Sequence, residues 1–204
     1  ARIDQGAYVE LRMQQLELAR GYDGLLRGMP EPTVLVGVYR VDEGHARILG
    51  RFLYRFERPG GFPTKVAPRQ ASRESVTFVP SSGTRVVVLA LAVEEDSGRG
   101  LQYLYGELED GDAVVAWTEH EGAPVPMHLP ELLAGSLPPD LGHRIHLMFG
   151  DRDPSVSLSG DDWIDANLLW AELGGRRQVH RLRFVSTDER NDWTAELELL
   201  VRRA

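Results

Sequence analysis

The densest group of chemically capable side chains is an acidic, serine-rich stretch near the middle of the C-terminal half. It places five aspartates within fifteen residues, with serine hydroxyls between them: Asp151, Asp153, Asp161, Asp162 and Asp165. Carboxylates crowded on one loop repel one another unless solvent or a cation offsets their charge. One interpretation is a calcium site, because calcium takes about six to eight oxygen ligands, several of them carboxylates. The other is a solvated loop in which Asp161 or Asp162 caps a helix.

Motifs for covalent or nucleotide chemistry are absent from the sequence. It contains no G-x-S-x-G, no G-x-x-x-x-G-K-[ST] and no H-E-x-x-H. It also has no cysteine, which excludes thiolate catalysis, disulfides and cysteine-bound zinc. His143 and His146 are three residues apart on an expected strand, so their side chains point to opposite faces and make a poor metal pair. We therefore expect a protein that is not an enzyme.

The charge of the chain argues against nucleic acid as a partner. The formal net charge is −8, whereas nucleic-acid binding needs a dense basic face. The densest basic group is Arg176, Arg177, Arg181 and Arg183, and its alternation with apolar residues predicts a solvated sheet face.

The composition is that of a globular protein. Hydrophobic residues make up 42% and charged residues 26% of the chain. No apolar run approaches the roughly 20 residues of a membrane span. The first residues carry no apolar signal segment, and arginine far outnumbers lysine, as in proteins of GC-rich bacteria. We expect a bacterial, cytoplasmic protein.

Alternation of apolar and polar residues predicts a mostly β chain. The first expected strand, 8–18, changes phase near Gln14 and Gln15, which indicates a bulge. The unbroken apolar run from Val86 to Val93 predicts a central strand buried on both faces. Residues 161–173 fit either a short helix or a strand, and one helical turn is expected at 130–134. The other expected strands are 33–41 with 46–56 as a hairpin, 74–79, 85–93, 101–108 with 112–118 as a second hairpin, 143–149, 178–185 and 194–201.

These elements predict a single domain over residues 1–204, an antiparallel β-sandwich with long loops rich in proline and glycine and one or two short helices. Trp117 and Trp193 fall in expected strands and are predicted in the core. Trp163 and Trp170 flank the acidic stretch. Core packing is the favoured interpretation for them, and a ligand platform is the alternative.

The order of acidic loops and strands resembles that of C2 domains. In that family the first strand leads into an acidic loop that ends in Asp-Pro-Tyr-Val, and the third loop carries Asp-x-Asp and then Asp-Asp-Phe-Ile-Gly. Here strand 8–18 leads to Asp23 and then to Glu31-Pro32-Thr33-Val34, and Asp151-Arg152-Asp153 precedes Asp161-Asp162-Trp163-Ile164. The resemblance implies a C2-like sandwich with Ca²⁺ as its cofactor. Its ligands would be Asp23, Glu31, Asp151, Asp153 and Asp161.

A second alignment with the same family fits the chain spacing better. It matches residues 73–96 to the strands before the third loop, so that Glu94, Glu95 and Asp96 become the acidic ligands. Residues 110–175 would then be an insertion. The sequence is consistent with both alignments.

Three functions are consistent with these patterns. The favoured one is a non-enzymatic binding or assembly module whose acidic loops bind calcium or contact a protein partner or another copy of the chain. Membrane contact would need calcium, because the net charge of −8 repels anionic lipid, and would use Leu25, Leu26, Arg27 and Met29. The alternative is a structural subunit of a larger bacterial or phage assembly without a ligand. A hydrolase with paired carboxylates is less favoured.

Overall fold

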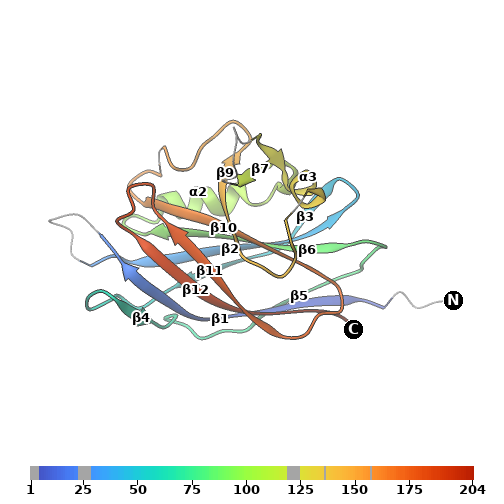
Figure 1. Ribbon diagram of the computed structural model, residues 1–204, viewed down its shortest axis with the longest axis horizontal. Helices are drawn as coiled ribbons and strands as arrows, with labels where there is room; N and C mark the ends of the chain where they lie inside the picture. The colour runs from blue at the N-terminus through green and yellow to red at the C-terminus, as the bar shows by residue number, and fades with distance from the viewer. Residues whose placement is uncertain (1–4, 23–28, 119–124, 136, 157) are drawn as a thin grey trace.

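Two antiparallel β-sheets packed face to face form the body of the protein (Figure 1). The computed structural model describes residues 5–22, 29–118, 125–135, 137–156 and 158–204. The small sheet has the order β11-β12-β1-β4, and β5 also pairs with β1. Its strands are β1 (Ala7–Arg20), β4 (Thr64–Val66), β5 (Glu74–Phe78), β11 (Gln178–Val185) and β12 (Asp192–Arg203). The predicted antiparallel sandwich is confirmed.

The large sheet has the order β3-β2-β6-β10-β9-β7-β8. Its strands are β2 (Pro32–Asp42), β3 (His45–Arg55), β6 (Arg85–Glu94), β7 (Val114–Thr118), β8 (Met127–His128), β9 (His143–Phe149) and β10 (Asp162–Glu172). The predicted hairpin of β2 with β3 is confirmed. The expected strands 74–79 and 85–93 are β5 and β6, and they belong to different sheets.

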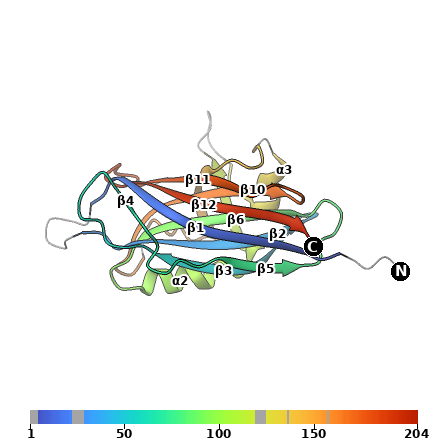
Figure 2. The ribbon, with the colours of Figure 1, turned by 90° about the horizontal axis from the view of Figure 1, so that it is seen from below.

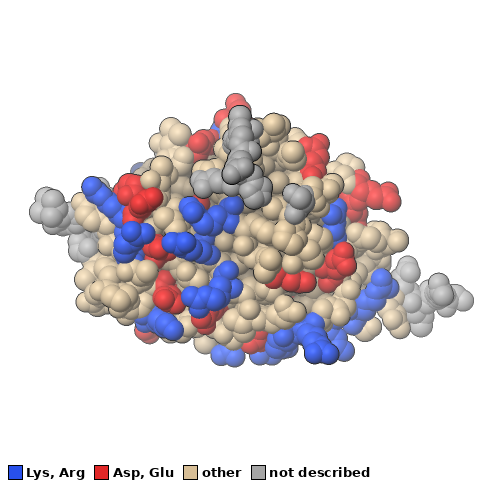
Figure 3. Space-filling model, in the orientation of Figure 1, with Lys and Arg blue, Asp and Glu red and all other residues tan. Residues whose placement is uncertain are grey.

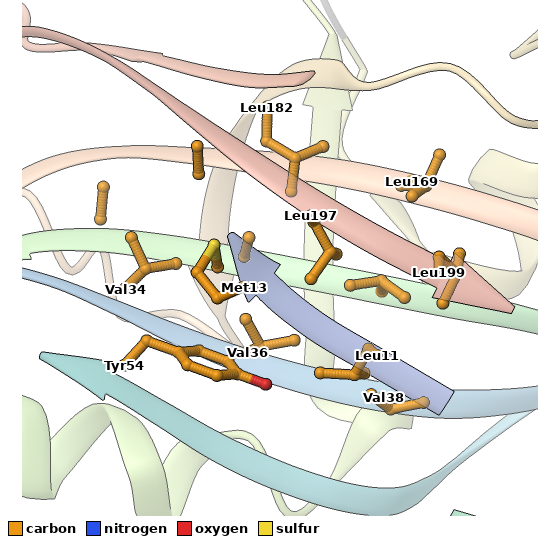
Figure 4. Packing of buried hydrophobic residues seen from close by; sticks show 14 of the residues in the cluster. Leu11, Met13, Val34, Val36, Val38, Tyr54, Leu169, Leu182, Leu197 and Leu199 are labelled. Atoms are coloured by element: carbon orange, nitrogen blue, oxygen red, sulfur yellow. The ribbon is translucent and has the colours of Figure 1, made fainter. Parts of the chain in front are cut away.

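The core between the sheets is built from inward-facing side chains of alternating residues. In β1 these are Leu11 and Met13 on one side of the bulge and Leu16 and Leu18 on the other, all buried. The register shifts between Met13 and Gln15, where the bulge was predicted. The extra residue keeps the apolar residues on the inner face after their phase changes. Leu11 and Met13 face Val34, Val36 and Val38 of β2 in this core (Figure 4).

A second core lies on the other face of the large sheet, and two short helices cover it. They are α2 (Arg99–Glu107) and α3 (Leu129–Ala134), and Figures 1 and 2 show them on the side away from the small sheet. Residues 86–93 of β6 are fully buried because alternate side chains enter the two cores. In the described residues, neither helix has the length and apolar character to cross a membrane.

The predicted hairpin of 101–108 with 112–118 is wrong. Residues 99–107 form α2, because Leu101, Leu104 and Leu108 recur at helical spacing and all three are buried in the second core. The second half of the expected hairpin is a strand, β7, but it pairs with β9 and β8. Residues 162–172 resolve as a strand, β10, which lies between β6 and β9.

Candidate functional site

Four connecting segments meet at one end of the sandwich, which we call the loop end: the described parts of residues 21–31, 95–98, 150–161 and 186–191. Strand register brings them together, because Pro32 and Asp162 both lie opposite Glu94. At the same end of the small sheet, the backbone N–H of Tyr22 after β1 donates to Asn191 Oδ1 before β12 at 3.0 Å. Tyr22 and Asn191 line one cavity together with Ser159 and Asp161 of the 150–161 segment. The described members of both acidic groups that the two alignments proposed therefore lie at the same end.

Asp161 joins the 150–161 segment of the loop end to the start of α2. Its side chain is buried, with the residue only 4% exposed, and α2 has no cap from its own N-cap residue, Gly98. The carboxylate supplies the missing acceptors at distances between 2.6 and 3.2 Å, with Oδ1 accepting from the N–H groups of Asp96, Ser97 and Gly98 and Oδ2 from those of Gly100 and Leu101. Asp161 thus caps a helix, but one that precedes it by 60 residues in sequence rather than one that follows it.

The electrostatics of Asp161 agree with this role. Burial alone raises the pKa of its carboxyl, but the backbone N–H groups of Ser97, Gly98 and Asp96 outweigh that effect and hold the pKa below its usual value. The fit of the two segments is close, since a side chain at Gly100 would come within 2.4 Å of the Leu158 carbonyl oxygen.

Arginines neutralise two of the other candidate ligands. Glu31 forms an ion pair with Arg58. Glu95 accepts two bonds from the guanidinium of Arg55, at 2.7 and 2.9 Å. Glu94 is buried, and its Oε1 accepts the backbone N–H of Glu31 at 3.1 Å.

The other candidate ligands are Asp151, Asp153, Asp96 and Asp23. Asp153 Oδ1 accepts bonds from the N–H and the hydroxyl of Ser155, at 2.8 and 2.6 Å. Asp23 lies outside the described residues, as do Leu25, Leu26 and Arg27. Within the described parts of the chain, no three acidic or histidine side chains are placed to hold a metal ion.

A groove opens at the loop end where β9 leaves β10. These strands pair only over Ala166–Ile145, Asn167–Arg144 and Leu168–His143, after which β9 continues beside β7. The gap is a cavity of about 240 Å³, which adjoins a wider one of about 660 Å³ under residues 154–162. We call the two cavities together the strand-end groove. Its lining includes Trp117, Arg144, His146, Trp163, Asp165 and Glu189.

Asp165 is a buried acid in the floor of this groove. Its Oδ2 accepts from Arg144 Nε at 2.7 Å and from the Val185 N–H at 2.9 Å. Burial raises the pKa of Asp165, and the bonds from Val185 and Arg144 offset this only in part. A bulge between Trp163 and Asp165 sets the direction of this side chain. Sequence patterns give no signal for the pair, because the strand order that joins β9 to β10 is not encoded locally.

The tryptophans divide between core and groove. Trp193 is fully buried, as predicted, and Trp170 is buried with its Nε1 donating to the Leu137 carbonyl at 3.1 Å. Trp117 was predicted in the core, but it is only half-buried and stacks on His146 with ring centroids 5.4 Å apart. Trp163 packs partly against the second core and also lines the groove.

The arginines of the small sheet are paired with acids on its outer face. Arg177 contacts Glu10 and Glu198, both at 2.7 Å, and Arg181 and Arg183 have acidic partners of their own. Figure 3 shows basic and acidic side chains interspersed over β11 and β12. The basic group is therefore a solvated, charge-balanced face.

Comparison with known proteins gives similarity in structure but none in sequence. No protein-family model and no curated protein matches the chain. Human GIVD cytosolic phospholipase A2, solved with methyl gamma-linolenyl fluorophosphonate inhibitor and terbium chloride, is similar over 98% of this chain at 12% identity and a TM-score of 0.44, but the chain spans only 18% of its length.

Two C2 domain structures are also similar. A C2 domain of plant extended synaptotagmin 1 matches over 100% of this chain and 98% of its own, at 10% identity and a TM-score of 0.37. A C2 domain protein from Ramazzottius varieornatus matches over 97% of this chain and 89% of its own, at 9% identity and a TM-score of 0.33. C2 domains are also the family that the order of acidic loops and strands resembles in sequence.

Proposed function

We propose that this chain is a non-enzymatic binding module that docks a protein partner with its loop end. The observation that carries the proposal is the exposure of large apolar side chains around the groove. Val156 is 78% exposed and Tyr22 is 41% exposed, and both line the groove, while Met29 in the same end is 41% exposed. Tyrosine and methionine are enriched in protein interfaces, and exposed apolar groups rimmed by polar residues mark contact sites.

The support for a binding role lies in how the loop end is held. Asp161 hydrogen-bonds the 150–161 segment to the first turn of α2. Arg55 forms an ion pair with Glu95, and Arg58 forms one with Glu31. These contacts fix a contact surface in advance, which lowers the entropy cost of association.

Crosslinking inside cells tests the docking surface. A photo-crosslinking amino acid placed at Val156 is expected to give an adduct of defined mass with a partner protein. The matched control is Val179, on β11 and 52% exposed, where no adduct of that mass is expected. Adding Tyr22→Ser and Met29→Ser should reduce the Val156 adduct, because these side chains belong to the same surface. Adducts of equal yield from both positions, or none from Val156, would reject the proposal.

Calcium is not part of this proposal, because four of the candidate ligands are bound within the chain, namely Asp161, Glu31, Glu94 and Glu95. We expect the thermal midpoint to be the same in millimolar calcium and in excess chelator. A ligand that binds only the folded state adds roughly 2.7 kcal/mol at 100 times its Kd, so a bound ion would be visible. A higher thermal midpoint in calcium that disappears in the Asp153→Ala variant would instead assign a calcium ion to the 150–161 segment. Asp151 and Asp23 would then be further candidate ligands.

A further inference from the structure

The strand-end groove has a chemical character of its own. Its walls carry aromatic rings from three separate elements: Tyr22 after β1, Trp117 in β7 and Trp163 in β10. Its floor holds the Arg144–Asp165 pair. The groove is therefore concave, partly aromatic and rich in polar side chains.

The charge of the groove is strongly one-sided. Two of its carboxylates are satisfied within the chain, Asp161 by backbone N–H groups and Asp165 by Arg144. The others that line it are Asp153, Asp162, Asp188 and Glu189. Among the described lining residues, Arg144 is the only lysine or arginine, and its charge is matched by Asp165. A cationic group entering the groove would therefore meet the negative charge of Asp153, Asp162 and Glu189.

A contact within the chain already places an arginine against the walls of the groove. The guanidinium of Arg190 lies over the ring of Tyr22, 4.5 Å from its centroid, and its Nε is 3.7 Å from Asp188 Oδ2. An arginine thus already uses one aromatic ring and one carboxylate of the groove. Trp117 and Trp163 line the groove together with Asp153 and Glu189, and tryptophan is the strongest aromatic partner for a cation.

We propose that the strand-end groove admits a lysine or arginine side chain of the partner polypeptide, held by the indole rings and by Asp153 and Glu189. The inference rests on the proposed function and adds the chemistry of the partner to it, namely a basic segment. The net charge of −8 favours the encounter with such a segment over long range. The cavity of about 240 Å³ brings both indole rings and both carboxylates to one place.

Tryptophan fluorescence gives a direct test with the purified chain, because two of its four tryptophans line the groove. The probe is a short blocked peptide of alternating arginine and glycine. Its control is the same peptide with citrulline in place of arginine, which keeps the shape and removes the charge. We expect the arginine peptide to change the emission in a saturable manner and the citrulline peptide to leave it unchanged.

Paired variants separate the groove from general electrostatics. Asp153→Asn combined with Glu189→Gln should raise the Kd on the order of tenfold, since it removes two charges beside the bound cation. Glu109→Gln combined with Glu131→Gln makes the same change in net charge on exposed residues outside the groove lining and should leave the Kd unchanged. Thermal midpoints establish that each variant is folded.

Each outcome decides between the two proposals. Saturable binding that is lost only in the groove variant supports the basic-side-chain site. Equal binding of the citrulline peptide, equal weakening by the control pair, or no response to arginine overturns it. If the Val156 crosslink still forms in that case, the loop end remains the docking surface and only the cationic chemistry is wrong. If the crosslink is also missing, the proposed function fails as well.

Discussion

Replacing Asp161 by alanine is expected to lower the free energy of unfolding by about 3 kcal/mol. The change removes a carboxylate that five backbone N–H groups share. A helix cap alone contributes about 0.5–2 kcal/mol, and hydrogen bonds to a charged group contribute about 1.5–3 kcal/mol each. Water can reach some of the released donors, so the loss is far smaller than the sum. Urea unfolding of the variant beside the wild type measures it.

The neighbouring aspartate provides the control for this prediction. Asp162 is exposed, so Asp162→Ala should change the stability by less than about 0.5 kcal/mol. Because the pKa of Asp161 is held below its usual value in the folded state, its contribution is present above the unfolded pKa and is lost as the pH falls through the folded one. The difference between wild type and Asp161→Ala should therefore shrink in acid. Equal losses for the two aspartates would show that Asp161 does not hold α2 in place.

The strands were predictable from the sequence because their signals are local. Alternation along residues 8–18 gave β1 with its bulge, and the unbroken apolar run of residues 86–93 gave a strand buried on both faces. The sequence indicated that both faces of this strand are covered, but not which element covers the second face. Residues 99–107 supply part of that cover as α2, and the leucine spacing over residues 101–108 carried a helical signal that the strand interpretation overlooked.

The candidate site could be predicted only in part, because it depends on which strand ends meet. The acidic segments were recognised, and the structure places the described ones at one end of the sandwich. The sequence could not show that Asp161 reaches the first turn of α2 or that Arg55 binds Glu95, since these contacts join residues far apart in the chain. Acids that are clustered in the sequence thus make separate contacts in the structure.

The groove was missed for a related reason. It exists because β9 leaves β10 after three paired residues, and no local pattern encodes that divergence. Its floor joins Arg144 of β9 to Asp165 of β10, and the pair is unusual in that an acid is kept buried beside an open cavity.

Arg144→Met is expected to lower the free energy of unfolding near neutral pH by about 2 kcal/mol. Removing one partner of a fully buried pair costs about 3–5 kcal/mol because the other charge stays unpaired, and the 38% exposure of the arginine side chain reduces that figure. Burial already raises the pKa of Asp165, and the loss of Arg144 takes away part of what opposes this rise. A carboxyl whose pKa is raised by folding contributes stability below its unfolded pKa and loses it as the pH rises through the folded value. The deficit of the variant relative to wild type should therefore be smaller at about pH 4.5 than at neutral pH.

The double variant decides whether the unpaired charge is the cause. Adding Asp165→Asn to Arg144→Met removes the buried charge and keeps an oxygen for the Val185 N–H, so it should restore most of the stability at neutral pH and abolish the pH dependence of the deficit. Denaturant unfolding of the wild type, the single variant and the double variant at the two pH values provides the comparison. A deficit that is the same at both pH values and persists in the double variant would mean that Arg144 acts through packing of its side chain against β9 and β10. In that case the floor of the groove would be held by shape and not by charge.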